Sequence, residues 1–597
     1  MEPMIGIDLG TTNSVVACMK DGRPAVVLNL EGGALTPSIV AFDERGRSSV
    51  GISAEGKATS TAVPGQGESY AAAVVSSIKR RMGSDHVVET DAGTFTPVEI
   101  SAMILEKLKS DAETRLGQPI VGVVVTVPAY FNDNQRRATR QAATMAGLEV
   151  RRLVNEPTAA ALAYGLHMEN AHTVLVWDLG GGTFDVSILE LGDGVFEVKA
   201  VNGNTHLGGD DYDERLAEIL AAEFRRQHGV NLGDDPAGAR LLRHWAERAK
   251  IQLSSQVEAC VTLPKHFARR EGCTVTVTRD VFERATADIT ERMLGPARQA
   301  LSDARLDPLD LDRVVLVGGM TRVPAVRRLV KEITGLEPYG HIDPDKVVAL
   351  GAAIQAGVLA GKVPRVTLVD VTPLSLGIET QGGLLGRIIE RNTPIPTSRG
   401  RLYTNARDDQ TEMEIHVLQG ERELAADNIS LGTFELLGLT PQPRGRAKVE
   451  VTFDIDANGM VQVFATDLHT EASIKVRLEA GTSPEQQVVK RMLAESQEQS
   501  ASDRRKRKEL EAGIYAENLI RVAKQLVEEA AQTPTGESVR RATEAAERGA
   551  SALQDALAGG SLERIEEATG TLEALLRELN QAVKVAREYR GARDHAA

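Results

Sequence analysis

Hydrophobic and polar positions follow one pattern over about the first 360 residues of this 597-residue chain. Short apolar runs that suit strands alternate there with polar stretches at helical spacing. The apolar run 119–128 precedes a polar stretch at 132–147, and the run 313–319 precedes another at 323–335. Such alternation is typical of α/β layers with partly parallel sheets, which we expect over residues 1–361.

The pattern changes twice after residue 361. Closely spaced apolar alternations with turn residues between them, such as Asn458-Gly459, predict an antiparallel β-sandwich. From Ser483-Pro484 onward the composition is that of helices, and proline is favoured in a first helical turn. The chain is therefore divided into an α/β domain at 1–361, a linker at 362–371, a sandwich at 372–480, a helical bundle at 481–585 and a short tail at 586–597.

Length and composition limit the classes of protein to consider. A chain this long should form several domains, since a single core rarely exceeds roughly 250–300 residues. Hydrophobic residues make up 42% and charged residues 26%, as in globular proteins. The excess of 84 acidic over 69 basic residues argues against general binding of nucleic acid or anionic membranes. We therefore interpret the basic run 503–509 as a solvated helix face.

The cysteines and the N-terminus predict a reduced, cytoplasmic setting. Cys18, Cys260 and Cys273 form no CxxC pair and have no histidine at metal-ligand spacing. This pattern favours free thiols over disulfides or a zinc site. The first residues lack the basic segment of a signal peptide, and no run approaches the ~20 apolar residues of a membrane span.

A first candidate phosphate loop lies at residues 5–14, IGIDLGTTNS. A strand that ends in Asp8 delivers a carboxylate to the edge where α/β sheets place ligands. Gly10 removes a side chain that would block a ligand, and the residues after it offer backbone N–H groups and hydroxyls to an anion. The predicted cradle comprises Gly10, Thr11, Thr12 and Asn13, with Asp8 near a hydrated divalent cation.

The same pattern returns at 174–185, VLVWDLGGGTFD. A strand ends in Asp178, and an open loop follows, with Gly180, Gly181, Gly182 and Thr183. Either loop alone would also fit an ordinary turn after a strand. The repetition predicts a duplicated fold whose two halves close on one nucleotide.

A third glycine-rich segment supports this interpretation. The buried run 314–319 ends in Gly318-Gly319, where glycines let a flat base or ribose lie against the backbone, and Arg322 can stack on it. The sequence has no Walker-A motif and no kinase glycine-loop set. We therefore expect phosphate chemistry on a different fold.

At these residues the chain resembles the actin-like ATPases and, among them, the seventy-kilodalton heat-shock chaperones of the bacterial DnaK type. The stretches that carry the resemblance include IGIDLGTTNS, DLGGGTFDVS, HLGGDDYD, VGGMTRVP and DVTPLSLGIET. It covers nearly the whole chain and implies a two-lobed ATPase domain, a peptide-binding β-sandwich and a helical lid.

The resemblance implies a role for each matching residue of the nucleotide site. Asp8 and Asp178 would hold the water ligands of Mg²⁺, and Thr183 would be the autophosphorylated residue. Lys79 would position the attacking water, and Glu156 would sense metal and nucleotide, although the residues before Lys79 depart from the usual family sequence. Adenosine would be lined by Glu247, Lys250, Ser254, Gly319, Arg322 and Asp345. ATP and Mg²⁺ are the implied cofactors, with K⁺ as a further candidate.

Coupling between the domains is implied for three places. Pro128 and Arg136 match the family's switch and relay. The linker segment 366–370 is apolar where a plain linker would be polar, so it should dock on another surface. The coupling residues expected there are Val366, Leu368, Val369 and Asp370; Thr367 replaces a leucine usual in the family, which suggests weaker docking.

The resemblance also implies a peptide site on the sandwich. An extended peptide would bind through main-chain hydrogen bonds and one small apolar pocket. Gln381 and Met413 depart from the usual Met and Val, which suggests a shallower and more adaptable pocket. Several of these positions would equally suit a plain β core. The matching residues are Ile378, Gln381, Tyr403, Ala406, Met413, Ile415 and Val449.

These inferences combine into an ATP-dependent chaperone for extended apolar segments of unfolded polypeptides. Its implied partners are a J-domain co-chaperone of the DnaJ type and a nucleotide-exchange factor of the GrpE type, and the chain itself would be mostly monomeric. The alternatives are a specialised chaperone for iron–sulfur assembly, an actin-like sugar kinase and a filament-forming actin relative. The last two have no evident use for a sandwich and a helical bundle.

Overall fold

The computed structural model describes residues 4–594 except 44, 60–70, 91–92, 166–170, 233–235, 264–272, 341, 365, 472, 477–499, 532–535 and 560. The chain divides into two compact units, which are described separately. The first comprises residues 1–377, 387–420 and 429–490, and the second residues 378–386, 421–428 and 491–597. The limits of these units fall within the region predicted as a sandwich, and the predicted boundaries at 361 and 480 stay predictions.

The first lobe of the first unit is built on a mixed sheet with the order β11-β10-β1-β2-β3. Its central strand β1 runs parallel to β10 and antiparallel to β2. Strand β10 is buried at every position, as a strand covered on both faces requires. The strands are β1 (Met4–Asp8), β2 (Asn13–Lys20), β3 (Arg23–Val27), β4 (Thr36–Pro37), β10 (Gly122–Val127) and β11 (Glu149–Asn155).

Smaller elements and helices complete this lobe. Helix α2 begins with a capping box between Thr96 and Glu99 and ends at Gly117, whose φ is 68°. The elements are β5 (Val40–Asp43), β6 (Ser48–Val50), β7 (Ala71–Val75), β8 (Val88–Thr90), β9 (Gly93–Phe95), α1 (Ile52–Thr59), η1 (Ile78–Arg81), α2 (Pro97–Leu116), α3 (Asp133–Met145) and α4 (Glu156–Gly165).

The second lobe repeats the topology of the first. Its sheet has the order β17-β12-β13-β14-β18-β21, and β12 runs antiparallel to β13 and parallel to β17. The predicted duplication is therefore confirmed. The strands are β12 (His172–Leu179), β13 (Phe184–Gly192), β14 (Val195–Asn204), β15 (Glu258–Thr262), β16 (Thr274–Thr278), β17 (Arg313–Val317), β18 (Thr367–Val371) and β21 (Pro394–Ile395).

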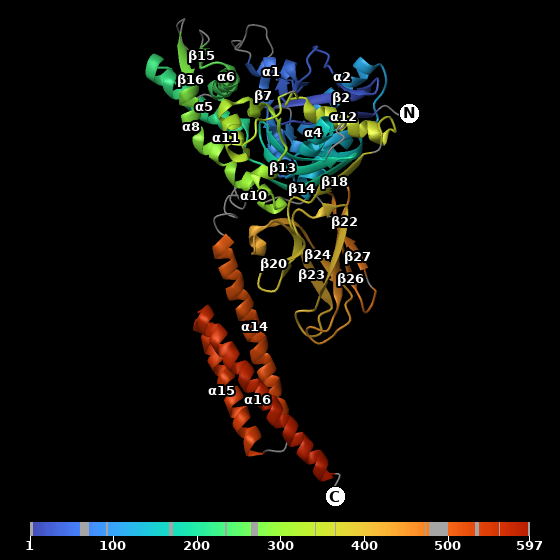
Figure 1. Ribbon diagram of the computed structural model, residues 1–597, viewed down its shortest axis with the longest axis vertical. Coiled ribbons are helices and arrows are strands. Elements are labelled where there is room, and N and C mark those ends of the chain that lie inside the picture. The colour runs from blue at the N-terminus through green and yellow to red at the C-terminus, as the bar shows by residue number, and fades with distance from the viewer. Residues whose placement is uncertain are drawn as a thin grey trace. The chain divides into compact units, whose positions relative to one another are not determined.

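Helices cover the second lobe and join it to the first (Figure 1). Helix α12 is apolar almost all round and buried from Val347 to Gly357 except at the half-buried Leu350, because it packs against α4 and also against strands of the first lobe. The helices are α5 (Gly209–His228), α6 (Pro236–Ser255), α8 (Arg279–Ala285), α9 (Ala287–Glu291), α10 (Leu294–Ala304), η2 (Pro308–Asp310), η3 (Gly319–Arg322), α11 (Pro324–Thr334) and α12 (Val347–Leu359).

Two antiparallel sheets form the predicted sandwich, with the orders β20-β19-β23-β24 and β22-β25-β26-β27. The predicted hairpin around Asn458-Gly459 is present, since β25 and β26 pair across it. The elements are β19 (Leu376–Thr380), β20 (Leu384–Ile389), β22 (Thr397–Tyr403), β23 (Glu412–Gln419), η4 (Ala425–Asp427), β24 (Ile429–Leu437), β25 (Val449–Ile455), β26 (Val461–Asp467) and β27 (Ser473–Val476).

The second unit contains a bundle of α14 (Ser500–Ala531), α15 (Glu537–Gly559) and α16 (Leu562–Asp594), which lie side by side around one apolar core (Figure 1). Helix α16 continues to Asp594, so the tail predicted from residue 586 is mostly helical. The predicted helix start at Ser483-Pro484 lies outside the described residues. The basic run 503–509 belongs to α14, where Arg505 pairs with Glu509 and Arg507 with Glu511 and Glu423.

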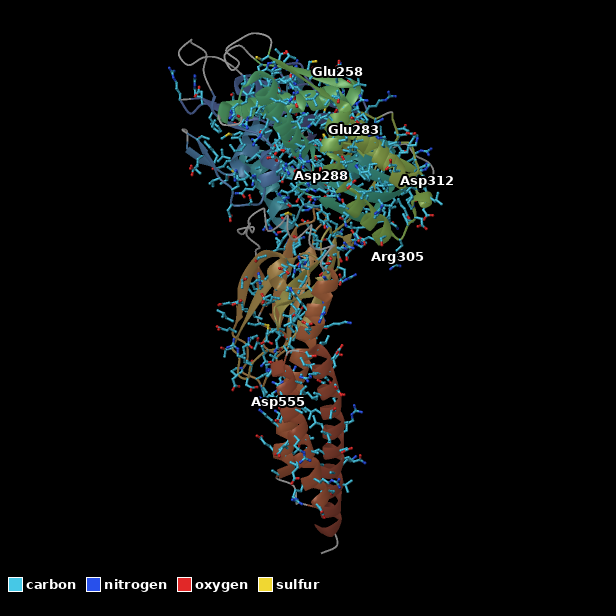
Figure 2. All side chains as sticks on the ribbon, turned by 90° about the vertical axis from the view of Figure 1, so that its left-hand side faces the viewer. Glu258, Glu283, Asp288, Arg305, Asp312 and Asp555 are labelled. Atoms are coloured by element: carbon cyan, nitrogen blue, oxygen red, sulfur yellow. The ribbon has the colours of Figure 1, made fainter. Side chains whose placement is uncertain are left out.

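Charged side chains cover the outer surfaces of both units, as Glu283 and Asp288 of the first and Asp555 of the second illustrate (Figure 2). Glu283 pairs with Arg328 and Asp288 with Arg215. Over the described part of the chain, no helix has both the length and the apolar character needed to cross a membrane. The predicted fold class, a two-lobed α/β domain with a β-sandwich and a helical bundle, is confirmed.

Candidate functional site

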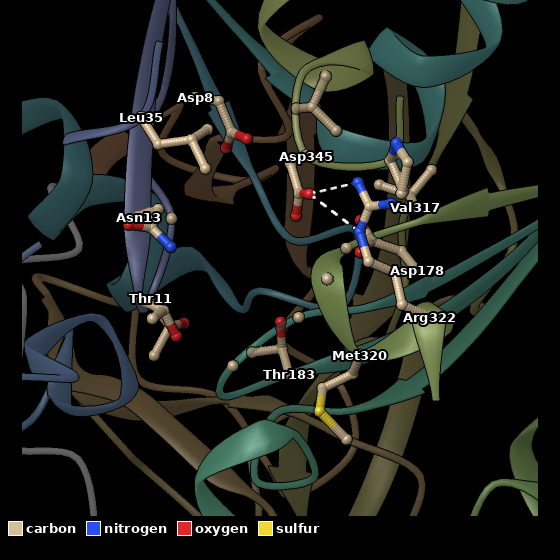
Figure 3. A pocket seen from close by; sticks show the side chains of 18 of the residues that line it. Asp8, Thr11, Asn13, Leu35, Asp178, Thr183, Val317, Met320, Arg322 and Asp345 are labelled. Atoms are coloured by element: carbon tan, nitrogen blue, oxygen red, sulfur yellow. Dashed lines mark hydrogen bonds and ion pairs between the residues drawn. The ribbon is translucent and has the colours of Figure 1, made fainter. Parts of the chain in front are cut away.

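A cavity of about 300 Å³ lies between the two phosphate-loop hairpins of the first unit (Figure 3). It is lined by 18 of the 19 residues predicted for catalysis and nucleotide binding; Gly182 is the exception. Apolar side chains, including Leu35 and Met320, also line it. The predicted residues brought together are Asp8, Gly10, Thr11, Thr12, Asn13, Lys79, Glu156, Asp178, Gly180, Gly181, Thr183, Glu247, Lys250, Ser254, Gly318, Gly319, Arg322 and Asp345.

The two loops approach each other so closely that glycine is required between them. A Cβ on Gly181 would lie 2.0 Å from the hydroxyl oxygen of Thr12. Any larger residue at 181 would therefore push the loops apart. The backbone of both loops faces one ligand-sized space, as the repeated sequence pattern predicts.

Two buried aspartates end the strands that lead into these loops. Asp8 accepts a hydrogen bond of 3.1 Å from the Thr126 hydroxyl. Burial, together with the charge of Glu156, raises the pKa of Asp8 to about 7. Burial and the same charge also raise the pKa of Asp178, whose Oδ2 has no hydrogen-bond partner among the described residues. Buried carboxylates in this condition favour a nearby cation.

Two carboxylates of the cavity, Asp8 and Asp178, suit a hydrated cation. Within the part of the chain that the structure describes, no group of three or more His, Cys, Asp or Glu side chains could hold a metal ion. Asp8 and Asp178 could hold a cation through its water ligands, since Mg²⁺ commonly retains several of them, and this contact stays a prediction.

Lys79 and Glu156 form a buried ion pair beside the aspartates. The Nζ–Oε1 distance is 2.5 Å, and the lysine is 5% exposed. Burial by itself lowers the pKa of Lys79, but the charges of Glu156 and Asp8 outweigh it, so the pKa is raised overall. Lys79, which only the family resemblance predicted as a site residue, is therefore a charged group in the cavity wall.

The opposite wall of the cavity comes from α6 and the segment around η3. Glu247, Lys250 and Ser254 lie on one face of α6 at spacings of three and four residues, as a helix requires. The Arg322 guanidinium donates to Asp345 Oδ2 at 2.6 Å (Figure 3). It also donates to Asp343 Oδ1 at 2.8 Å. These pairs fix the plane of the guanidinium at the cavity edge.

Asp185, on β13, was missed as a candidate site residue. It lies opposite Asp178 in the β12–β13 register, and its buried carboxylate interacts with the backbone N–H groups of Ala129 and Tyr130. Burial, with the charge of Glu156, raises the pKa of Asp185 to about 7. An acidic residue within a buried strand was the available signal, but its position next to the site depends on the pairing of β12 with β13.

The linker forms a strand of the second-lobe sheet, between β14 and the short strand β21. Strand β18 runs parallel to β14 and pairs Leu368 with Phe196 and Val369 with Glu197. The Thr158 hydroxyl donates to Asp370 Oδ2 at 3.0 Å. Val366 and Leu368 pack against the core between the lobes. The Thr367 side chain is exposed, so its replacement of a family leucine removes no buried contact here.

Arg136 joins the first lobe to the β25–β26 turn. Its guanidinium donates to the carbonyl oxygens of Phe131 and Asn458, and Asn458 Oδ1 accepts from the Leu153 N–H at 3.0 Å. A Cβ on Gly459, whose φ is +73°, would lie 3.2 Å from the guanidinium carbon. Pro128, the predicted switch, is buried just after β10, and its carbonyl accepts from the Phe131 N–H at 3.2 Å.

The residues predicted to bind peptide differ in exposure. In the first unit Met413, Ile415 and Val449 are buried, Tyr403 is half-buried and Ala406 is exposed. In the second unit Ile378 is buried and Gln381 is exposed. Burial of Met413, Ile415 and Val449 agrees with a plain β core as well as with a peptide pocket. The roles of all the residues predicted to bind peptide stay predictions.

The family model described as Hsp70 protein matches residues 4–584. Members of this family are ATP-dependent chaperones that hydrolyse ATP, generally use Mg²⁺, and work with unfolded clients, J-domain proteins and nucleotide-exchange factors. The match spans nearly the whole chain, over the lobes that carry both phosphate loops as well as the sandwich and the bundle. The protein therefore belongs to the Hsp70 family.

Proposed function

We propose that this protein is a cytoplasmic chaperone of the DnaK type that binds extended apolar segments of unfolded polypeptides. ATP binding would favour release of the segment, and hydrolysis would favour its capture. One observation carries the coupling: the linker strand β18 belongs to the same sheet as the β12–β13 hairpin with its phosphate loop. A change at that loop therefore has a continuous hydrogen-bonded path to the linker.

The nucleotide would lie in the cavity with its phosphates between the two loops. Backbone N–H groups around Thr11, Thr12 and Gly181 would bind phosphate oxygens, as anions bind in such concave loops. The Lys79 ammonium would orient the attacking water and stabilise charge on the transferred phosphoryl group. Hydrolysis then needs positioning and electrostatic stabilisation more than covalent chemistry.

Glu156 and the aspartates would complete the catalytic group. Glu156 holds Lys79 in place through their 2.5 Å ion pair. Asp8 and Asp178 would hold the water ligands of Mg²⁺, which when bound supplies positive charge next to the phosphates. Thr183, at the cavity wall, is the residue proposed to accept a phosphoryl group in autophosphorylation.

The adenosine would lie against the face of α6 and the Gly318-Gly319 backbone. Glu247, Lys250 and Ser254 present polar groups there, and the Arg322 plane, fixed by Asp345, would cover the base. Among the described residues, this arrangement combines an apolar wall with a few placed polar groups, as small-molecule sites commonly do.

Client binding is proposed for the β-sandwich. The buried Met413, Ile415 and Val449 support an apolar pocket. The exposed Gln381 is proposed to contact the peptide as well. A J-domain co-chaperone of the DnaJ type would speed hydrolysis, and an exchange factor of the GrpE type would speed ADP release. A role in the stress response follows from this proposal.

The experiment that tests the proposal measures release of a fluorescent apolar peptide after ATP is added to the full-length protein. Wild type should release the peptide faster with ATP than with ADP. Lys79→Ala should bind ATP and release peptide on its addition, yet hydrolyse ATP at least ~10²-fold more slowly, as expected when a charge-stabilising group is lost.

Two results would contradict the proposal. Equal peptide lifetimes with ATP, ADP and no nucleotide would remove the coupling. Near-normal hydrolysis by Lys79→Ala would remove the catalytic assignment. Arg505→Ala on α14 serves as a control, because that exposed side chain pairs with Glu509 of the same helix and does not line the cavity.

A further inference from the structure

We infer that Asp213 is a positioning residue of the nucleotide site and acts by holding the Lys250 ammonium in place for the ligand. This inference rests on the proposed nucleotide site. Asp213 lies on α5 and does not line the cavity, whereas Lys250 lies on α6 and does. The carboxylate therefore acts through the lysine and does not touch the ligand.

The contacts of Lys250 carry the inference. Its Nζ donates to Asp213 Oδ2 at 2.7 Å and to the Gly209 carbonyl oxygen at 3.3 Å. The side chains of both ion-pair partners are largely buried, with 9% of Lys250 and 13% of Asp213 exposed. A lysine side chain has about 2 kcal/mol of rotamer entropy, so fixing it before the ligand arrives improves binding.

Asp213 is itself held rigidly on α5. The preceding Tyr212 is fully buried, and its hydroxyl lies 2.9 Å from the Thr290 hydroxyl. Two residues further on, Arg215 pairs with Asp288 at 3.1 Å. Because contacts on both sides fix the helix, the Asp213 carboxylate occupies one position relative to the cavity.

One oxygen of Asp213 has no structural use. Its Oδ1 is buried with no hydrogen-bond partner in the described part of the chain. A buried carboxylate with an unused oxygen costs stability, which a purely structural residue would not need to incur. A role in orienting Lys250 accounts for an acid at this position.

The test measures the affinity of full-length variants for ADP by titration calorimetry at pH 8; ADP is used because it is not hydrolysed. Asp213→Asn is nearly isosteric and should weaken ADP binding about fivefold to tenfold, the range expected for coupled neighbours. Lys250→Met should weaken it at least as much. In the Lys250→Met background, Asp213→Asn should add less than about twofold. Glu214→Gln, an exposed neighbour on α5, is the matched control and should change nothing.

A pH series separates positioning from a general structural role. The charged groups that act on Asp213 are Lys250 and Glu247 from α6 and Asp210 from α5. Burial raises the pKa of Asp213 to about 7. Protonation at pH 6 should therefore remove most of the difference in ADP affinity between wild type and Asp213→Asn, whereas a structural defect would persist at both pH values.

The outcomes distinguish a failure of the proposed nucleotide-binding role of Lys250 from a failure of the inference about Asp213. If Lys250→Met binds ADP normally, the proposed role of Lys250 fails. If Lys250→Met binds weakly but Asp213→Asn binds like wild type at pH 8, the inference about Asp213 is wrong. Should Asp213→Asn not fold, Asp213→Glu replaces it: it keeps the charge and should lose less affinity than Lys250→Met, and an equal loss would contradict the inference.

Discussion

The two lobes share one topology but differ at one paired position of their central hairpins. In the first hairpin Asp8 lies opposite Val15, whereas in the second Asp178 lies opposite Asp185. Asp8 also accepts a hydrogen bond from Thr126, while Asp178 Oδ2 has no hydrogen-bond partner among the described residues and has the buried Asp185 beside it. The duplicated fold therefore supplies two similar loops, but the second hairpin carries two buried carboxyl groups at the position where the first carries one.

The lobes also differ in what docks on them. The second-lobe sheet continues past β14 with the linker strand β18, while the first-lobe sheet ends at β3. The first lobe instead contacts the turn that contains Asn458 and Gly459, through Arg136 and Leu153. A symmetric nucleotide site is thus connected asymmetrically to the rest of the first unit.

The largest effect should come from Asp178, whose Oδ2 has no hydrogen-bond partner among the described residues. Asp178→Asn should lower ATP hydrolysis about 10²- to 10³-fold, a loss typical for an electrostatic group of an active site. It should also raise the melting temperature of the nucleotide-free protein, because a buried unpaired charge is removed. Steady-state hydrolysis and thermal unfolding measure the two effects. Asp8→Asn should stabilise less, and equal stabilisation would refute the proposed difference between the hairpins.

The second prediction replaces Asp185 by valine, the residue type that lies opposite Asp8 in the first hairpin. Burial and the charge of Glu156 raise the pKa of Asp185 to about 7, above the ordinary value of 3.8. The native state then binds more protons than the unfolded state between those values, so this group's contribution to stability falls as pH rises from about 4 to 7. Asp185→Val removes this titration. As pH rises from 5 to 8, its free energy of unfolding should therefore increase by about 1–3 kcal/mol relative to that of wild type.

Urea denaturation of nucleotide-free protein at several pH values measures this gain. Because the chain has several domains, the comparison uses the transition of the first unit. Asp43→Asn is a useful contrast, since its carboxylate is also buried but has Arg47 as an ion-pair partner. A stability difference between Asp185→Val and wild type that is independent of pH would contradict the prediction.

A third change addresses the contact of the first lobe with the β25–β26 turn. Gly459 has a φ of +73°, and a Cβ there would lie 3.2 Å from the Arg136 guanidinium. Gly459→Ala should therefore strain the turn by about 1–2 kcal/mol and slow ATP-driven peptide release about threefold to tenfold. Stopped-flow release of a labelled peptide measures this.

Gly445→Ala is the matched control for that change. Gly445 also has a positive φ, +78°, in the same sandwich, but nothing lies within 4 Å of a Cβ built on it. The two variants share the backbone strain and differ in the Arg136 contact. Equal effects on release would mean that strain alone, and not the contact with the first lobe, was responsible.

The smallest effect is expected at the linker. The Thr367 side chain is exposed although its backbone N–H donates to the Gly194 carbonyl oxygen at 2.9 Å. Thr367→Leu adds no buried contact, so ATP-driven release should change less than about twofold. Leu368→Ala, which removes a half-buried side chain from the core between the lobes, should slow release several-fold in the same assay. A larger effect from Thr367→Leu would show that the linker docks differently.

The sequence by itself determined the kinds of element and most of the nucleotide site. Alternating apolar runs predicted the strands, and the two loops after Asp8 and Asp178 predicted a duplicated fold because each joins an acid to small residues. Those signals are local, since they depend on period and on backbone conformation within a few residues. Lys79 and Glu156 came from resemblance to a family, because an isolated charged residue carries no such local pattern.

Only the tertiary structure decided the contacts between distant segments. Asp185 and Asp213 became site residues through strand register and the packing of two helices, neither of which their neighbours in sequence specify. The exposure of Thr367 depends on which face of β18 packs against the core. Charge burial and partner choice are properties of groups brought together from far apart in the chain, so no window of sequence contains them.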